Sequence, residues 1–123
     1  MTKQNRRSRQ KAEIRGRRAE TFAALILRAK FYTILDRRVR FPSGEIDLIA
    51  KRGSVLAFVE VKQRPTVEQC QTSVHDRNWS RIASAAERWS AQRPQFSDCN
   101  WRYDLIAITP AGWPRHLRDF WRP

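Results

Sequence analysis

The chain has 123 residues, 41% of them hydrophobic, which is enough for one domain with a single modest core. Its formal net charge of +13 favours a polyanionic partner, nucleic acid first and an anionic membrane surface second, over the alternative of a merely basic surface. No apolar run approaches the ~20 residues of a transmembrane helix. The cysteines, Cys70 and Cys99, have no metal-type spacing, and without a secretory signal the expected location is the cytoplasm.

The N-terminal segment is strongly basic. Residues 1–18 hold eight cations against one acid, Glu13, so this segment carries more than half of the net charge. Segments of like charge are usually disordered in isolation and bind phosphates, so we predict a disordered basic arm over 1–15 and one domain over 16–123. A transit peptide is the alternative. The arm residues predicted to bind nucleic acid are Arg6, Arg7, Arg9, Lys11, Arg15, Arg17 and Arg18.

The first half of the domain contains a predicted helix followed by three predicted strands. Apolar residues at spacings of three and four predict a helix over 12–30. A β-prone segment follows over 31–41 and ends at a Pro-Ser-Gly turn. Two apolar strands, 45–50 and 55–62, are joined by a short loop with Gly53 at a turn position.

The second half contains a predicted helix and one more strand. Residues 66–76 are predicted to be loop or partial helix, 77–92 a helix and 101–108 a strand, while 114–121 is expected to form one short helix. The order helix-strand-strand-strand-helix-strand predicts an α/β fold, a mixed sheet with helices packed on it.

Three charged residues stand in or beside the two apolar strands of the hairpin. Glu60 and Lys62 share one face of their strand, because side chains alternate. A hairpin centred on 51–54 places Asp47 opposite a residue near Phe58 or Glu60, at ~4.5–5.5 Å. We therefore expect Asp47, Glu60 and Lys62 to converge at one end of the sheet.

Buried charges of this kind pair with one another or bind metal. In one interpretation, Asp47 and Glu60 bind Mg²⁺ or Mn²⁺ for phosphodiester hydrolysis, with the Val61 carbonyl as a further ligand and Lys62 acting on the nucleophile or the phosphate. In the other, an ion pair with Lys62 holds the two strands in register. Glu20 lies near the apolar face of the first helix, where it is either a surface residue or reaches into the site.

The hairpin resembles a known family. The string Gly44-Glu45-Ile46-Asp47-Leu48-Ile49-Ala50, followed by Phe58-Val59-Glu60-Val61-Lys62-x-Arg64, is similar to the YraN-type family of small bacterial proteins. That family is grouped with the PD-(D/E)XK, restriction-endonuclease-like superfamily, near the archaeal Holliday junction resolvases. Asp47 matches the metal-binding aspartate, and residues 60–62 match the E-x-K element. Gly16-x-x-Ala19-Glu20 resembles the family's first-helix motif, and 102–108 its late strand.

The resemblance implies a restriction-endonuclease-like fold and a Mg²⁺-dependent endonuclease acting on DNA, with branched or processed DNA as one option. It implies catalytic roles for Asp47, Glu60, Lys62 and Glu20, the first two as metal ligands. DNA is the expected partner, a membrane is not, and junction-cutting relatives suggest a homodimer.

One position departs from the family pattern. Asn78-Trp79 stands where the family usually has Lys-Gln, so Asn78 is a predicted nucleic-acid contact that only partly replaces the pair. The alternatives are therefore a catalytically inactive nucleic-acid-binding protein of the same fold and a basic structural protein with an ion-pair network.

Other polar and aromatic residues receive no catalytic role. Asp104 is expected to be structural, capping the backbone or pairing with an arginine. His75 and His116 stand alone and remain unassigned. Trp89 and Trp101 are expected to fill the core.

Overall fold

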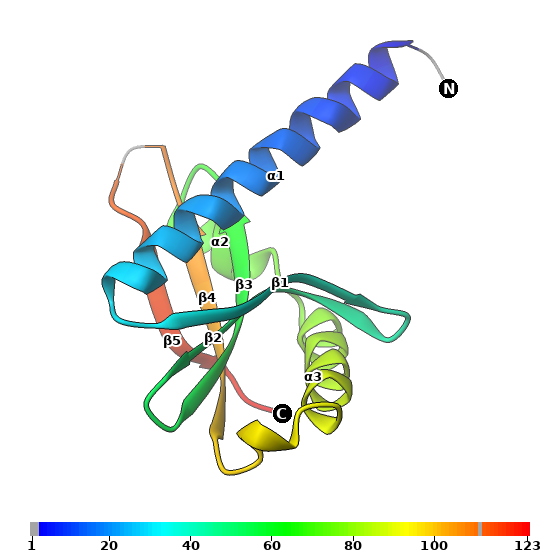
Figure 1. The fold of residues 1–123 in the computed structure, drawn as a ribbon. Coiled ribbons are helices and arrows are strands. Elements are labelled where there is room, and N and C mark those ends of the chain that lie inside the picture. Colours follow the sequence, from blue (N-terminus) through cyan, green and yellow to red (C-terminus); the bar gives the residue numbers. More distant parts are fainter. Residues whose placement is uncertain (1–2, 111) are drawn as a thin grey trace.

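The computed structural model describes residues 3–110 and 112–123. Its elements, in chain order, are α1 (Lys3–Ala29), β1 (Thr33–Phe41), β2 (Gly44–Arg52), β3 (Val55–Gln63), α2 (Val67–Thr72), α3 (Asp76–Ala91), a 3₁₀ turn (Pro94–Phe96), β4 (Asn100–Ile108) and β5 (Arg115–Trp121). Figure 1 shows α1 and α3 on either side of the sheet. This mixed α/β arrangement confirms the predicted class and is consistent with a restriction-endonuclease-like fold.

The five strands form one mixed sheet in the order β1-β2-β3-β4-β5. The hairpins β1–β2 and β2–β3 are antiparallel, as is β4–β5, whereas β3 and β4 are parallel. A parallel pair needs a long crossover, and the chain between β3 and β4 supplies it through α2 and α3. The two strands that carry the predicted site residues, β2 and β3, are therefore neighbours well inside the sheet.

Alternation along the central strands gives the sheet two apolar faces. In β3, Leu56 and Phe58 pack with buried α3 residues such as Trp89, in what we call the α3-face core. The intervening residues Ala57 and Val59 pack with α1 in the α1-face core. Burial on both faces explains why the sequence of this strand reads as a nearly continuous apolar run.

The N-terminal segment differs from the prediction. Residues 1–2 lie outside the described part, but 3–15 continue α1 as helix rather than forming a disordered arm. No proline interrupts this stretch, and its Arg, Lys, Gln and Ala residues are good helix formers, so a helix anchored further on propagates outward. Figure 1 shows this part of α1 extending beyond the sheet. No helix of the described residues is long and apolar enough to cross a membrane.

The C-terminal segment was also predicted incorrectly. The expected helix over 114–121 is the strand β5 in the structure. It pairs with β4, matching Leu117 with Leu105 and Trp121 with Tyr103. The open edge of β4 supplies backbone partners that no local pattern reports, so tertiary pairing overrides the helical spacing. In contrast, β2, β3, β4 and α3 lie within two residues of their predicted bounds.

Candidate active site

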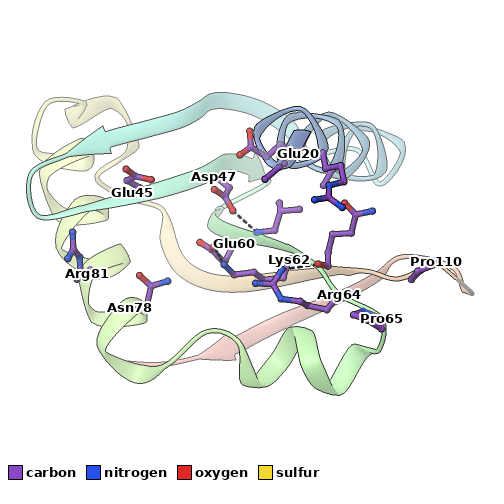
Figure 2. A pocket seen from close by; sticks show the side chains of 16 residues that line it. Glu20, Glu45, Asp47, Glu60, Lys62, Arg64, Pro65, Asn78, Arg81 and Pro110 are labelled. Atoms are coloured by element: carbon purple, nitrogen blue, oxygen red, sulfur yellow. Dashed lines mark hydrogen bonds and ion pairs between the residues drawn. The ribbon is translucent and has the colours of Figure 1, made fainter. Parts of the chain in front are cut away.

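The acidic residues predicted from the hairpin line one cleft of about 780 Å³. Asp47 comes from β2, Glu60 and Lys62 from β3, and Glu20 from α1. Figure 2 shows these four side chains around the cleft, with Asn78 of α3 on the opposite side from α1. The structure therefore brings together all four predicted catalytic residues.

Backbone pairing explains how Asp47 reaches the cleft. The pairing of β2 with β3 ends with Leu48 opposite Val59, so Asp47 and Glu60 lie just beyond the last pair, where both line the cleft. Asp47 Oδ2 accepts a hydrogen bond of 2.8 Å from the Val61 amide. Ile46 and Leu48 lie two positions apart yet pack in opposite cores, so the regular alternation of β2 is interrupted at Asp47.

Burial makes Glu60 and Asp47 weak acids. Glu60 is only 7% exposed, and burial, followed by the negative charge of Asp47, raises its pKa to about 8. Lys62 opposes this shift, with Nζ 3.5 Å from Glu60 Oε1. The pKa of Asp47 is also raised, chiefly by burial, against the Val61 hydrogen bond and Lys62. Near neutral pH Glu60 therefore largely retains its proton, which a bound cation would replace.

Glu20 reaches into the site rather than lying on the helix surface. It is 9% exposed and lines the cleft. Arg38 Nε forms an ion pair with Glu20 Oε2 at 3.1 Å, and among the described residues this oxygen has no hydrogen-bond partner. Burial, then the charge of Asp47, raises the pKa of Glu20, and Arg38 lowers it. A buried carboxylate oxygen is thus left for another partner.

The oxygen donors of the cleft fit a hard divalent cation. In the described part of the chain, no group of three or more Asp, Glu, His or Cys side chains could hold a metal by itself. The available set is Asp47 and Glu60, with the Val61 backbone at the same cleft. Mg²⁺ prefers oxygen ligands and keeps several waters, so two carboxylates are sufficient for it.

An arginine rim surrounds the acids, and the sequence prediction found only part of it. Exposed Arg15, Arg64 and Arg81 line the cleft, but only Arg15 was predicted to bind nucleic acid. Arg81 lies one helical turn after Asn78, which also lines the cleft. This i, i+3 spacing is the feature of the sequence from which Arg81 could have been predicted to share the site. Trp79, by contrast, is buried in the α3-face core.

The other cations predicted for the arm lie on the exposed part of α1 outside the cleft lining: Arg6, Arg7, Arg9, Lys11, Arg17 and Arg18. Glu45 stands at the cleft edge with its side chain 68% exposed, 3.9 Å from Arg40. Its exposure separates it from the buried acids of the same hairpin.

Gly44 fixes the distance between the acidic strand and the arginine-bearing helix. A Cβ added at Gly44 would lie 2.2 Å from the backbone oxygen of Arg81. The start of β2 therefore touches the main chain of α3 directly, which only glycine permits. This contact sets where Asn78 and Arg81 stand relative to Asp47.

Asp104 lies away from the cleft and has the structural role predicted for it. It is fully buried and bonds to Arg102 at 2.8 Å and to His116 Nε2 at 2.8 Å. His116, which stands alone in the sequence and has no role assigned from it, is brought to Asp104 by strand β5. Trp89 is buried as expected, whereas Trp101 is 39% exposed, so its predicted core position is wrong.

Comparison with known proteins identifies the family. The model of the uncharacterised protein family UPF0102 matches residues 19–108, which include all four predicted catalytic residues. A UPF0102 protein of Caulobacter vibrioides is 51% identical over 106 residues, 86% of this chain and 85% of that protein. One from Maricaulis maris is 45% identical over 117 residues, 95% and 92% of the two chains. The chain therefore belongs to UPF0102, the YraN family, within the PD-(D/E)XK-like superfamily.

Proposed function

We propose that this protein is a Mg²⁺-dependent endonuclease that hydrolyses phosphodiester bonds in DNA, with branched or processed intermediates as candidate substrates. The observation that carries the proposal is the convergence of Asp47, Glu60 and Lys62 from two adjacent strands in a cleft with an arginine rim. A DNA substrate is in keeping with the cytoplasmic location expected from the sequence.

Asp47 and Glu60 would hold the cation, with the Val61 carbonyl as a further oxygen donor. Bound there, Mg²⁺ or Mn²⁺ would supply Lewis-acid polarisation of the phosphate and a water of lowered pKa. The raised pKa values of both carboxyls favour this role, since the negative charge that burial disfavours is compensated by a cation.

Lys62 supplies a fixed positive charge at the reacting phosphate. Its Nζ is held 3.5 Å from Glu60 Oε1, at the cleft and partly exposed. From there the ammonium group offsets negative charge that develops on the phosphate oxygens, acting as a point charge. Glu20 Oε2, which is ion-paired with Arg38 but accepts no hydrogen bond from the described residues, would accept one from a water and so orient it.

The second candidate function is nucleic-acid binding without cleavage, on the same fold. The observation in its favour is Asn78, which lines the α3 side of the cleft where the family pattern has a lysine. An amide cannot offset phosphate charge as an ammonium group does. Arg81, one turn later on the same helix, supplies a positive charge on this wall and favours the enzyme.

Calorimetric titration of Mg²⁺ and Mn²⁺ tests the metal site. The wild type should bind, and Asp47→Asn and Glu60→Gln should each lose most of the affinity. Glu45→Gln is the matched control, because it removes an exposed carboxylate from the same hairpin. Equal loss in all three variants would assign the binding to general surface charge.

Cleavage of labelled linear, nicked and four-way DNA then tests the chemistry. Wild type with Mg²⁺ or Mn²⁺ should cut at least one substrate, and Lys62→Ala should bind DNA normally without cutting. If the wild type cuts nothing with either metal while Lys62→Ala still binds, the nuclease proposal is wrong and the second candidate stands.

A further inference from the structure

On the basis of the nuclease function proposed above, we infer that the cleft takes an unpaired DNA strand, held by its phosphates between α1 and α3, rather than a duplex. Besides Lys62, three positive charges line the cleft, and they come from three separate parts of the chain. Arg15 lies on α1, Arg64 directly follows β3, and Arg81 lies on α3. Figure 2 shows α1 and α3 on opposite sides of the cleft, with Arg64 below the acids.

The three guanidinium groups are available for phosphate. All three residues are exposed, and none takes part in an ion pair within the described residues. Arg64 donates one hydrogen bond to the neighbouring Gln63 carbonyl, which leaves the other N–H donors of its guanidinium group for a ligand. In the described part of the chain these three arginines are thus paired with no carboxylate, although Glu45 stands at the cleft edge and the other acids lie deeper.

The depth of the acids in the cleft favours an unpaired strand over a duplex. Glu60 is 7% exposed, whereas the arginines stand at the rim, so a reacting phosphate has to enter between the two helices. A duplex is stiff and brings its complementary strand along with every phosphate, whereas an unpaired strand can bend into a cleft alone. An unpaired strand also leaves both sides of its backbone open to contact from α1 and α3.

The lining of the cleft leaves room for a backbone, and its described residues include no aromatic side chain on which a base could stack. The α1 wall consists of Ala12, Gly16 and Ala19 beside the charged residues, and a Cβ added at Gly16 would meet nothing within 4 Å. No Trp, Tyr, Phe or His is among the lining residues in the described part of the chain. Aromatic stacking platforms are the usual means of holding bases of a single strand, so we expect contacts to phosphate and little sequence preference.

Fluorescence anisotropy in EDTA measures binding without cleavage. The wild type and the variants Arg15→Gln, Arg64→Gln and Arg81→Gln are titrated against a labelled single strand and against its duplex, over a range of salt concentrations. Arg28→Gln is the matched control, because it removes an exposed charge of α1 outside the cleft. For a single strand, each lost phosphate contact should reduce the log–log salt slope by about 0.7.

We expect each rim variant to weaken single-strand binding with this change of slope while changing duplex binding no more than Arg28→Gln does. Equal weakening of single strand and duplex, or effects no larger than the control's, would overturn the unpaired-strand assignment. EDTA removes the metal and so prevents cleavage, which means that the assay measures binding alone. The unpaired-strand proposal and the nuclease proposal are therefore tested independently. A protein that cuts duplex DNA without this difference remains a nuclease, and one that shows the difference but never cuts is a single-strand-binding protein.

Discussion

Replacing Glu60 by glutamine should stabilise the protein at alkaline pH while removing a proposed metal ligand. Glutamine has nearly the same size and shape as glutamate but cannot ionise. In the wild type, burial and the charge of Asp47 raise the pKa of Glu60 from 4.5 to about 8. Above that pH the folded wild type contains the buried Glu60 carboxylate beside Asp47, with Lys62 as the nearby cation, whereas the variant has no group at position 60 that can ionise.

The sign and size of the effect follow from proton linkage. Between pH 4.5 and about 8, the folded protein retains a proton on Glu60 that the unfolded chain has released. The free energy of unfolding therefore falls as pH rises through this window, by ~1.4 kcal/mol per pH unit. Over the whole window this amounts to at most about 5 kcal/mol. Glu60→Gln is free of this loss, so its advantage should be small near the acidic end and largest above pH 8.

Urea unfolding followed by tryptophan fluorescence, in EDTA at acidic, neutral and alkaline pH, measures the difference. Glu45→Gln serves as the control, because its exposed carboxylate should show no comparable pH-dependent gain. Added Mg²⁺ should stabilise the wild type at alkaline pH and leave Glu60→Gln unchanged. A stability difference that is the same at acidic and alkaline pH, or a variant less stable than wild type at alkaline pH, would refute the assignment of a costly buried charge at Glu60.

Three further substitutions test the packing around the site. Gly44→Ala should lower the free energy of unfolding by ~1–3 kcal/mol, because its Cβ would lie 2.2 Å from the Arg81 carbonyl oxygen. Unchanged stability in urea would mean that α3 shifts away from β2 at no cost, against the close contact of Gly44 with Arg81. Gly16→Ala should raise thermal stability by up to ~1 kcal/mol, since alanine is the better helix former and nothing lies within 4 Å of the new Cβ; a loss would reveal an unseen contact. Asp104→Ala should lower the free energy of unfolding in urea by ~3–5 kcal/mol, because it leaves the partly buried Arg102 without its carboxylate. A loss below ~1 kcal/mol would contradict a structural role for Asp104.

Much of the candidate site could be predicted because it is local. Asp47, Glu60 and Lys62 lie on two strands joined by a short loop, and alternation along those strands with an antiparallel register determines which side chains meet. The turn residues over 51–54 limited the register, so that Asp47 was expected opposite a residue near Phe58 or Glu60. The sequence left open whether Glu20 reaches the site, because the helical pattern placed it near an apolar face without showing what that face covers.

The predicted secondary structure was wrong in two segments, where contacts with distant residues or the propagation of a helix determine the structure. The segment 114–121 has a spacing that suits a helix, but the free edge of β4 makes it a strand. Residues 3–15 look like an unstructured charged tail, but they continue a helix anchored by the α1-face core. Local pattern cannot report either effect, because the stabilising partner is elsewhere in the chain.

The sequence by itself determined the α/β class, the charged hairpin and the identity of its three convergent residues. These depend on periodicity, turn residues and pairing between adjacent strands, which are properties of short segments. Only the tertiary structure showed that Glu20 is buried opposite Asp47, that Gly44 touches the backbone of α3, and that Arg81 completes the rim. Those features depend on how two helices pack against opposite faces of one sheet, and packing between distant segments decides burial, charge environment and the shape of the cleft.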